Sequence, residues 1–171
     1  VAAARSDQLA TALDATLGQG RWQTPLGVVG SIVVRFPHRD GHEDPGDGGW
    51  HCDASYVGPD GTYWMNAASR DRAGLALFLF SDVGPDDAPT ELLAGSHLDV
   101  PAVLEPYGDE GASYLTLAQS LPPSTFEREV VAVTGAAGDV VVCHPFLVHR
   151  ATWPHRATTP RIIAQPAIPP A

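Results

Sequence analysis

The sequence predicts a mainly β protein, a sandwich or a barrel, with one helix near its start. After residue 20 the chain reads as a series of short β-branched and apolar runs, which Gly, Pro and Asp separate. Many short strands with turn signals between them are typical of sandwiches and barrels. The run LALFLF (75–80) is apolar at every position, which indicates a strand covered on both faces.

The helical pattern covers residues 5–17. Apolar residues recur at helical spacing from Leu9 to Leu17, and Ser6 is a suitable N-cap. Gly18 then favours the end of the helix. We therefore expect a helix that packs outside the β structure.

The predicted strands are the β-branched or apolar runs 28–36, 50–57, 61–67, 75–83, 89–96, 129–135, 138–152 and 161–168. Residues 38–49 read as a polar loop, and residues 98–124 as a long connection with one helical turn near 100–105. No repeat or linker divides the chain, so we expect one domain over residues 1–171. Its start has neither a Met nor a signal-peptide layout, and we expect it to lie inside a longer chain.

The composition indicates which kinds of molecule the protein can bind. Apolar residues make up 44% of 171 residues, which is enough for a packed core, and no run is long and apolar enough to span a membrane. The net charge of −10, with no lysine, argues against binding nucleic acid and favours a small-molecule substrate; nothing in the sequence indicates an oligomeric state. Cys52 and Cys143 are too few for a disulfide framework, so we expect two buried free thiols in the cytoplasm.

The stretch GGWHCDASY (48–56) places His51 and Asp53 two positions apart. On a strand, residues i and i+2 share a face, so the imidazole and the carboxylate would project together and Cys52 would point away. Two histidines and one carboxylate on one face of Fe(II) leave positions open for a cosubstrate and dioxygen. A His-x-Asp pair is a weak signal by itself, and the third ligand must be one of His38, His42, His97, His144, His149 and His155.

The wider context is more specific. Three blocks occur in order: WHCD (50–53), PTELLAGSH (89–97), and GDVVVCHPFLVHRA (138–151) followed by PRIIAQ (160–165). On these blocks the sequence resembles the phytanoyl-CoA dioxygenase (PhyH-like) family of Fe(II)/2-oxoglutarate-dependent oxygenases. The resemblance implies a double-stranded β-helix, which is a cupin-like jelly roll. It also implies a dioxygenase that hydroxylates a small molecule and releases succinate and CO2.

The family pattern maps the metal ligands onto His51, Asp53 and His149. His144 is the rival for the distal ligand. It lies five residues earlier (149 − 144 = 5) and would face the other side of an unbroken strand. Pro145 interrupts that strand, so His144 stays an alternative. His97 resembles a structural turn residue of the family.

The cosubstrate 2-oxoglutarate needs a cation for its distal carboxylate, and arginine binds a carboxylate through two parallel hydrogen bonds. The resemblance places this arginine on the last core strand, where Arg161 lies twelve residues after the distal ligand (161 − 149 = 12). Arg150 and Arg156 lie nearer to His149 in the sequence, but the composition around Arg156 indicates a loop. Thr90 is expected to add a hydroxyl to the cosubstrate pocket.

For the remaining histidines and the aromatic residues, the sequence supports only weaker expectations. Three histidines in polar loops, His38, His42 and His155, are expected to be solvated. Five aromatic residues are expected to serve mostly as core or as lining of an apolar substrate cavity: Trp50, Tyr56, Tyr63, Trp64 and Trp153.

Asp53 favours hydroxylation, because related halogenases lack this carboxylate. Two alternatives remain: a cupin-like metal enzyme that does not use 2-oxoglutarate, and an inactive barrel that binds a ligand.

Overall fold

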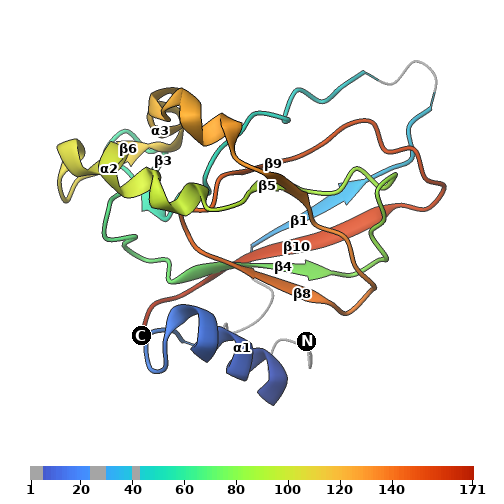
Figure 1. Cartoon of the computed structure of the whole chain (residues 1–171), viewed down its shortest axis with the longest axis horizontal. Coiled ribbons are helices and arrows are strands. Elements are labelled where there is room, and N and C mark those ends of the chain that lie inside the picture. Colours follow the sequence, from blue (N-terminus) through green and yellow to red (C-terminus); the bar gives the residue numbers. More distant parts are fainter. Residues whose placement is uncertain (1–5, 24–29, 40–42) are drawn as a thin grey trace.

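The fold comes from a computed structural model that describes residues 6–23, 30–39 and 43–171. It is mainly β, and two antiparallel sheets face one another in a jelly roll (Figure 1). The larger sheet has the order β1 (Gly30–Arg35), β10 (Arg161–Ile168), β4 (Gly74–Leu79) and β8 (Val140–Cys143). The facing sheet has the order β7 (Val130–Ala132), β5 (Glu91–Leu93) and β9 (His149–Arg150). The predicted fold class is therefore confirmed.

Strand β4 lies between two apolar layers. All six of its residues are buried. Leu75, Leu77 and Leu79 belong to the cluster between the two sheets, whereas Ala76 and Phe78 pack in a second cluster against α1 (Asp7–Leu17). This alternation follows from the two-residue period of a strand and explains why residues 75–79 are all apolar, whereas Phe80 lies beyond β4 and is exposed.

Helix α1 covers the outer face of the larger sheet through Leu9 and Leu13. The Ser6 hydroxyl accepts a hydrogen bond from the Leu9 amide at 3.2 Å. Gly18 follows the helix with φ +97°, a conformation that glycine adopts most readily. The helix and both of its end signals match the expectation from the sequence.

A smaller lobe at one end of the jelly roll carries most of the remaining helices. Its sheet consists of β2 (Tyr56–Val57), β3 (Tyr63–Met65) and β6 (Ala112–Ser113). Around it lie α2 (Val100–Leu104), α3 (Tyr114–Ser120) and the 3-10 turns η2 (Ser96–Leu98), η3 (Glu105–Tyr107) and η4 (Pro123–Glu127). The lobe packs on a core that includes Met65, Leu93, Val100, Leu117 and Phe146.

The sequence prediction missed α3. Ser113 caps this helix, since its hydroxyl accepts from the Thr116 amide at 3.1 Å. The helix has seven residues, of which only Leu117 is buried, so it is too short to give the sustained apolar pattern that predicts a helix.

Several predicted strands are shorter than expected. Of residues 50–57, only Tyr56–Val57 form a strand, and His51 makes an isolated bridge to His149. Residues 138–152 split into β8 and β9, because a turn closed by a hydrogen bond from the Leu147 amide to the His144 carbonyl lies between them. Residues 28–29 of the first predicted strand lie outside the described part of the chain.

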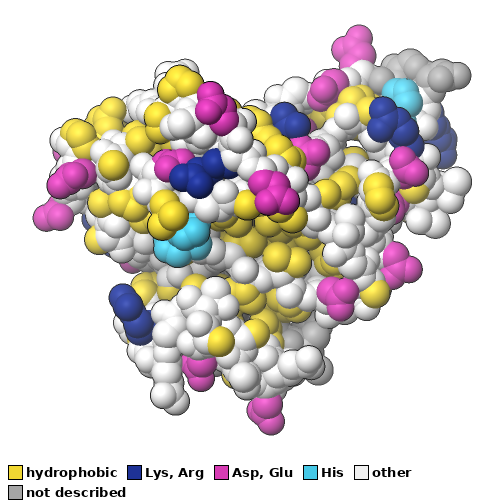
Figure 2. Space-filling view, viewed as in Figure 1, with side chains coloured by type: hydrophobic (Ala, Val, Ile, Leu, Met, Phe, Trp, Pro, Cys, Tyr) yellow, Lys and Arg dark blue, Asp and Glu magenta, His cyan; other side chains and the backbone are white. Residues whose placement is uncertain are grey.

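The helices of the described residues are all too short or too polar to cross a bilayer. Acidic side chains spread across the face shown in Figure 2 rather than gathering in one patch.

Candidate metal and cosubstrate site

Three side chains converge at the end of the jelly roll next to the smaller lobe. His51, Asp53 and His149 each offer a ligand atom, and these atoms lie within 4.8 Å of one another. The Nε2 atoms of His149 and His51 lie 3.7 Å and 3.9 Å from Asp53 Oδ1. Among the residues that the structure describes, this is the one group of three or more His, Cys, Asp or Glu side chains with such a spacing.

A backbone bridge brings the two histidines together. The His51 amide donates to the His149 carbonyl at 2.9 Å, and the His149 amide donates to the His51 carbonyl at 2.8 Å. The rings lie side by side, with centroids 4.6 Å apart. This bridge, and not a regular strand, places His51 beside His149, and Asp53 follows two residues later in irregular backbone.

Each imidazole is oriented by the backbone two residues before it. Nδ1 of His51 lies 2.8 Å from the Gly49 carbonyl, and Nδ1 of His149 lies 3.0 Å from the Leu147 carbonyl. A carbonyl only accepts, so each Nδ1 carries the proton and each neutral ring keeps a lone pair on Nε2. Metal-binding histidines are typically oriented in this way.

Electrostatics keep the carboxylate charged. Burial raises the pKa of Asp53, but His149, Arg72 and His51 outweigh that effect, so its pKa lies below the usual range. Burial and the neighbouring His149 lower the pKa of His51. For His149, burial lowers the pKa, but the Asp53 carboxylate outweighs burial and raises it.

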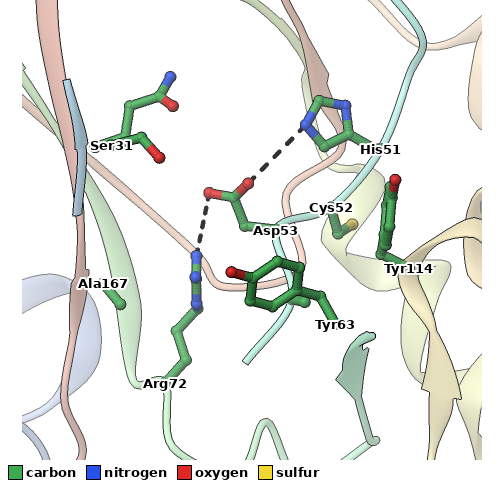
Figure 3. Close-up of a pocket in the computed structure, with 10 residues that line it drawn as sticks. Ser31, His51, Cys52, Asp53, Tyr63, Arg72, Tyr114 and Ala167 are labelled. Carbon is green, nitrogen blue, oxygen red and sulfur yellow. Dashed lines mark hydrogen bonds and ion pairs between the residues drawn. The ribbon is translucent and has the colours of Figure 1, made fainter. Parts of the chain in front are cut away.

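An open cavity of about 380 Å³ adjoins His51 and Asp53, whereas His149 is buried behind them and does not line it. Figure 3 shows His51 and Arg72 reaching the two oxygens of Asp53, with Tyr63 and Tyr114 close by. The cavity is lined by Ser31, His51, Cys52, Asp53, Ala54, Tyr63, Arg72, Tyr114, Gln165 and Ala167. The lining therefore mixes hydroxyl, amide and charged groups with small apolar ones, whereas the sequence predicted an apolar cavity.

The other histidines lie outside this cluster. His144, the rival distal ligand, is exposed; its Nδ1 accepts from the Phe146 amide at 3.1 Å, and its ring lies against His97. His38 is exposed, as expected, and His42 falls outside the described residues. The expectation for His155 is wrong, because its side chain is fully buried near Asp87.

The GSH block (95–97) has a structural role. Gly95 adopts φ +79° ahead of η2, and the buried Ser96 hydroxyl accepts from the Val148 amide at 2.9 Å. The GSH block therefore supports the backbone beside His149.

The aromatic residues divide between several environments. Two of the five aromatic residues expected to form core or cavity lining do so: Tyr63 lines the cavity, and Trp50 packs on the core and under Arg150. Tyr114 lines the cavity but was missed by sequence reasoning, because α3 was missed. Both cysteines are buried free thiols, and Cys52 Sγ donates to the Phe146 carbonyl at 3.3 Å.

Arg161 is the first residue of β10 and is only 1% exposed. Its Nη1 donates to the Ala88 carbonyl, and its buried Nε has no partner. Burial, followed by the nearby Arg35, lowers the pKa of Arg161 to about 10. Thr90, two residues after Ala88, is also buried.

The two other candidate arginines have different surroundings. Arg150 makes an ion pair with Glu91, at 2.6 Å between Nη2 and Oε2. Arg156 is exposed.

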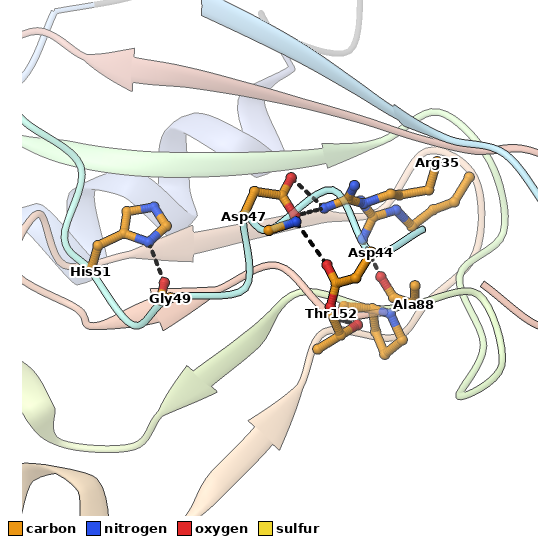
Figure 4. A network of polar contacts seen from close by, with 10 residues as sticks. Arg35, Asp44, Asp47, Gly49, His51, Ala88 and Thr152 are labelled. Carbon is orange, nitrogen blue, oxygen red and sulfur yellow. Dashed lines mark hydrogen bonds and ion pairs between the residues drawn. The ribbon is translucent and has the colours of Figure 1, made fainter. Parts of the chain in front are cut away.

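Sequence reasoning missed two further arginines. Arg72 Nη1 lies 3.2 Å from Asp53 Oδ2. Arg35, at the end of β1, is 7% exposed and binds Asp47 (Figure 4). The apolar residues that alternate with Arg35, Ile32 and Val34, are the exposed ones, so the pattern of β1 would have placed the arginine outside.

The chain belongs to the phytanoyl-CoA dioxygenase (PhyH) family, whose family model matches residues 4–162. The resemblance found in the sequence is therefore confirmed. A search of the curated proteins found no match.

Solved structures share the fold. The non-heme alpha-ketoglutarate-dependent carbocyclase SnoK from nogalamycin biosynthesis is 23% identical, with a TM-score of 0.54; the match covers 81% of this chain and 47% of SnoK. The epimerase SnoN, in complex with Fe3+, alpha-ketoglutarate and nogalamycin RO, is 18% identical, with a TM-score of 0.57; the match covers 98% and 56%.

A third neighbour is HygX from Streptomyces hygroscopicus with nickel and 2-oxoglutarate bound. It is 17% identical, with a TM-score of 0.52, and the match covers 98% of this chain and 65% of HygX. The chain thus spans between about half and two thirds of the length of these three proteins. At these identities, the likeness establishes the fold.

Proposed function

We propose that the chain is an Fe(II)- and 2-oxoglutarate-dependent dioxygenase that hydroxylates a small molecule. The observation that carries the proposal is the convergence of three ligand atoms within 4.8 Å, with both histidine Nε2 atoms near Asp53 Oδ1 and each Nδ1 held by a backbone carbonyl. Membership of the PhyH family supports the same class of reaction.

His51, Asp53 and His149 are the proposed ligands of the iron. Two neutral imidazoles and one carboxylate suit Fe(II) and leave its other face open. With iron bound, one atom of dioxygen enters a substrate C–H bond as a hydroxyl, and the other enters succinate as 2-oxoglutarate loses CO2. Asp53 keeps a carboxylate among the ligands, which favours hydroxylation over halogenation.

Arg161 is the proposed anchor of 2-oxoglutarate, with Thr90 beside it. A buried guanidinium without a carboxylate partner is costly, because isolated buried charge is poorly stabilised. The distal carboxylate of the cosubstrate would supply the missing counter-charge.

The proposed substrate is a small molecule with groups that form hydrogen bonds. A cavity of about 380 Å³ lies within the range of small-molecule sites. Ser31, Tyr63, Tyr114 and Gln165 line it and can contact hydroxyl or amine groups of the substrate. The net charge of −10 disfavours nucleic acid as a substrate.

Anaerobic titration of the Fe(II)-loaded protein with 2-oxoglutarate tests the proposal. We expect a visible metal-to-ligand charge-transfer band, and we expect succinate when oxygen is admitted. Iron binding without any response to 2-oxoglutarate would favour the cupin-like alternative. Failure to bind iron would favour the inactive barrel.

A further inference from the structure

Two buried arginines lie directly opposite each other at one end of the larger sheet. Arg35, the last residue of β1, pairs in register with Arg161, the first residue of β10. Directly opposed residues of an antiparallel pair project from the same face, so both side chains enter the interior. Their exposed fractions are 7% and 1%. Like charges at opposed positions destabilise a sheet, and burial increases that cost.

Nearby carboxylates neutralise only part of this charge. Asp47 accepts from Arg35 Nη2 through both oxygens, at 2.6 Å and 2.5 Å. Arg161 donates to a neutral carbonyl, that of Ala88. Asp87 lies in the same region, but its oxygens face His155 and the Gly84 amide. Of the two guanidinium groups, only that of Arg35 has a directly bound carboxylate.

Both arginines also carry an unused donor. The Nε atoms of Arg35 and Arg161 are buried and have no hydrogen-bond partner. Buried donors are nearly always satisfied in folded proteins. A single anion between the two side chains would accept from both and would supply the missing negative charge.

We propose that Arg35 is a second cosubstrate-binding residue, and that the distal carboxylate of a 2-oxo acid binds between Arg35 and Arg161. The inference rests on the proposed function, which assigns the cosubstrate to Arg161. The side chain of Asp47 is 51% exposed and lies on the loop that leads to His51. This carboxylate competes with the cosubstrate for Arg35, and two cations make the site selective for dicarboxylic 2-oxo acids.

Calorimetric titration of the Ni2+-loaded protein tests whether Arg35 binds the distal carboxylate of the cosubstrate. The ligands are 2-oxoglutarate and 2-oxobutanoate, which lacks the distal carboxylate. Arg35→Gln should weaken 2-oxoglutarate binding about tenfold or more, the scale of a charged hydrogen bond, and should leave 2-oxobutanoate within about twofold. Arg35→Lys should lose less, because it keeps the charge. Asp47→Asn should bind 2-oxoglutarate several-fold more tightly.

Asp47→Asn is the decisive control, since it keeps Arg35 in place even if Arg35→Gln does not fold. If Arg35 only holds the loop, Asp47→Asn and Arg35→Gln will weaken both ligands alike, and the inference fails. Parent-like affinity of Arg35→Gln, alongside a loss in Arg161→Leu, also overturns it and leaves the proposed function standing. A parent protein that binds no 2-oxoglutarate overturns both.

Discussion

Arg72 holds one oxygen of the Asp53 carboxylate: its Nη1 lies 3.2 Å from Oδ2, while Oδ1 faces the two imidazoles. The Arg72 side chain is only 12% exposed and that of Asp53 26%, so this contact lies partly buried at the wall of the cavity. The contact fixes the rotation of the carboxylate, and it presents a single oxygen to the centre between the histidines.

Removing this support should weaken metal binding. Arg72→Gln is expected to reduce Ni2+ or Co2+ affinity by about 10- to 100-fold, the usual scale for residues that orient metal ligands. Arg70→Gln is the matched control, because Arg70 is exposed and stacks on Tyr56. The measurement is a metal titration by calorimetry. Equal affinities for the two variants would show that Arg72 does not orient Asp53.

The distal ligand can be tested with a pair of neighbouring histidines. His149→Ala should abolish stoichiometric metal binding, because it removes one of three proposed ligands. His144→Ala should retain it, because the His144 ring faces His97 and lies outside the cluster. Metal content after gel filtration is the measurement. The opposite result would make His144 the ligand.

The anchor of 2-oxoglutarate can be tested on the arginines near the distal histidine. Arg161→Leu should raise the dissociation constant about tenfold to a thousandfold, the scale of losing a charged hydrogen bond worth ~1.5–3 kcal/mol or more. Arg150→Leu and Arg156→Leu should change it little, because Arg150 pairs with Glu91 and Arg156 is exposed. The charge-transfer band of the Fe(II) form reports the binding. Loss of the band in Arg156→Leu alone would show that Arg156, and not Arg161, binds 2-oxoglutarate.

The thiols should be unreactive while the protein is folded. Burial raises the pKa of Cys143 to about 11, and burial also raises the pKa of Cys52. Since the thiolate is the reactive form, both groups stay protonated and inert near pH 8. Ellman's reagent should therefore detect no thiol in the native protein and two in denaturant. Rapid reaction of one thiol in the native state would contradict this.

The parts of the fold that the sequence predicted are those with a strong local pattern. The Ser6 cap and the apolar spacing from Leu9 onward predicted α1, and the uninterrupted LALFLF run predicted a strand between two layers. Helix α3 has only seven residues and buries only Leu117, so its pattern is too short to stand out from the long connection around it. The limits of the strand around His51 depend on its long-range partner, and local propensity does not contain that information.

The residues of the candidate site likewise fall into those that a sequence motif predicts and those that only the three-dimensional structure places. His51, Asp53, His149 and Arg161 follow from motif order, and the structure brings the first three together. Arg35 and Arg72 have no motif. The inward position of Arg35 comes from its pairing with Arg161, and the role of Arg72 depends on where the turn before β4 lies relative to Asp53. Register and turn placement are tertiary properties, which explains why both residues were missed.

The bridge between His51 and His149 also constrains how the protein matures. It joins backbone positions 98 residues apart (149 − 51 = 98), and closing a loop of that length costs ~4 kcal/mol of chain entropy. On the ribosome, His51 and Asp53 emerge long before the third side chain does. If these three side chains are the ligands proposed above, a nascent chain offers a metal only a two-point contact until β9 has been synthesised and has docked. The proposed iron site would then be completed only after translation has passed His149.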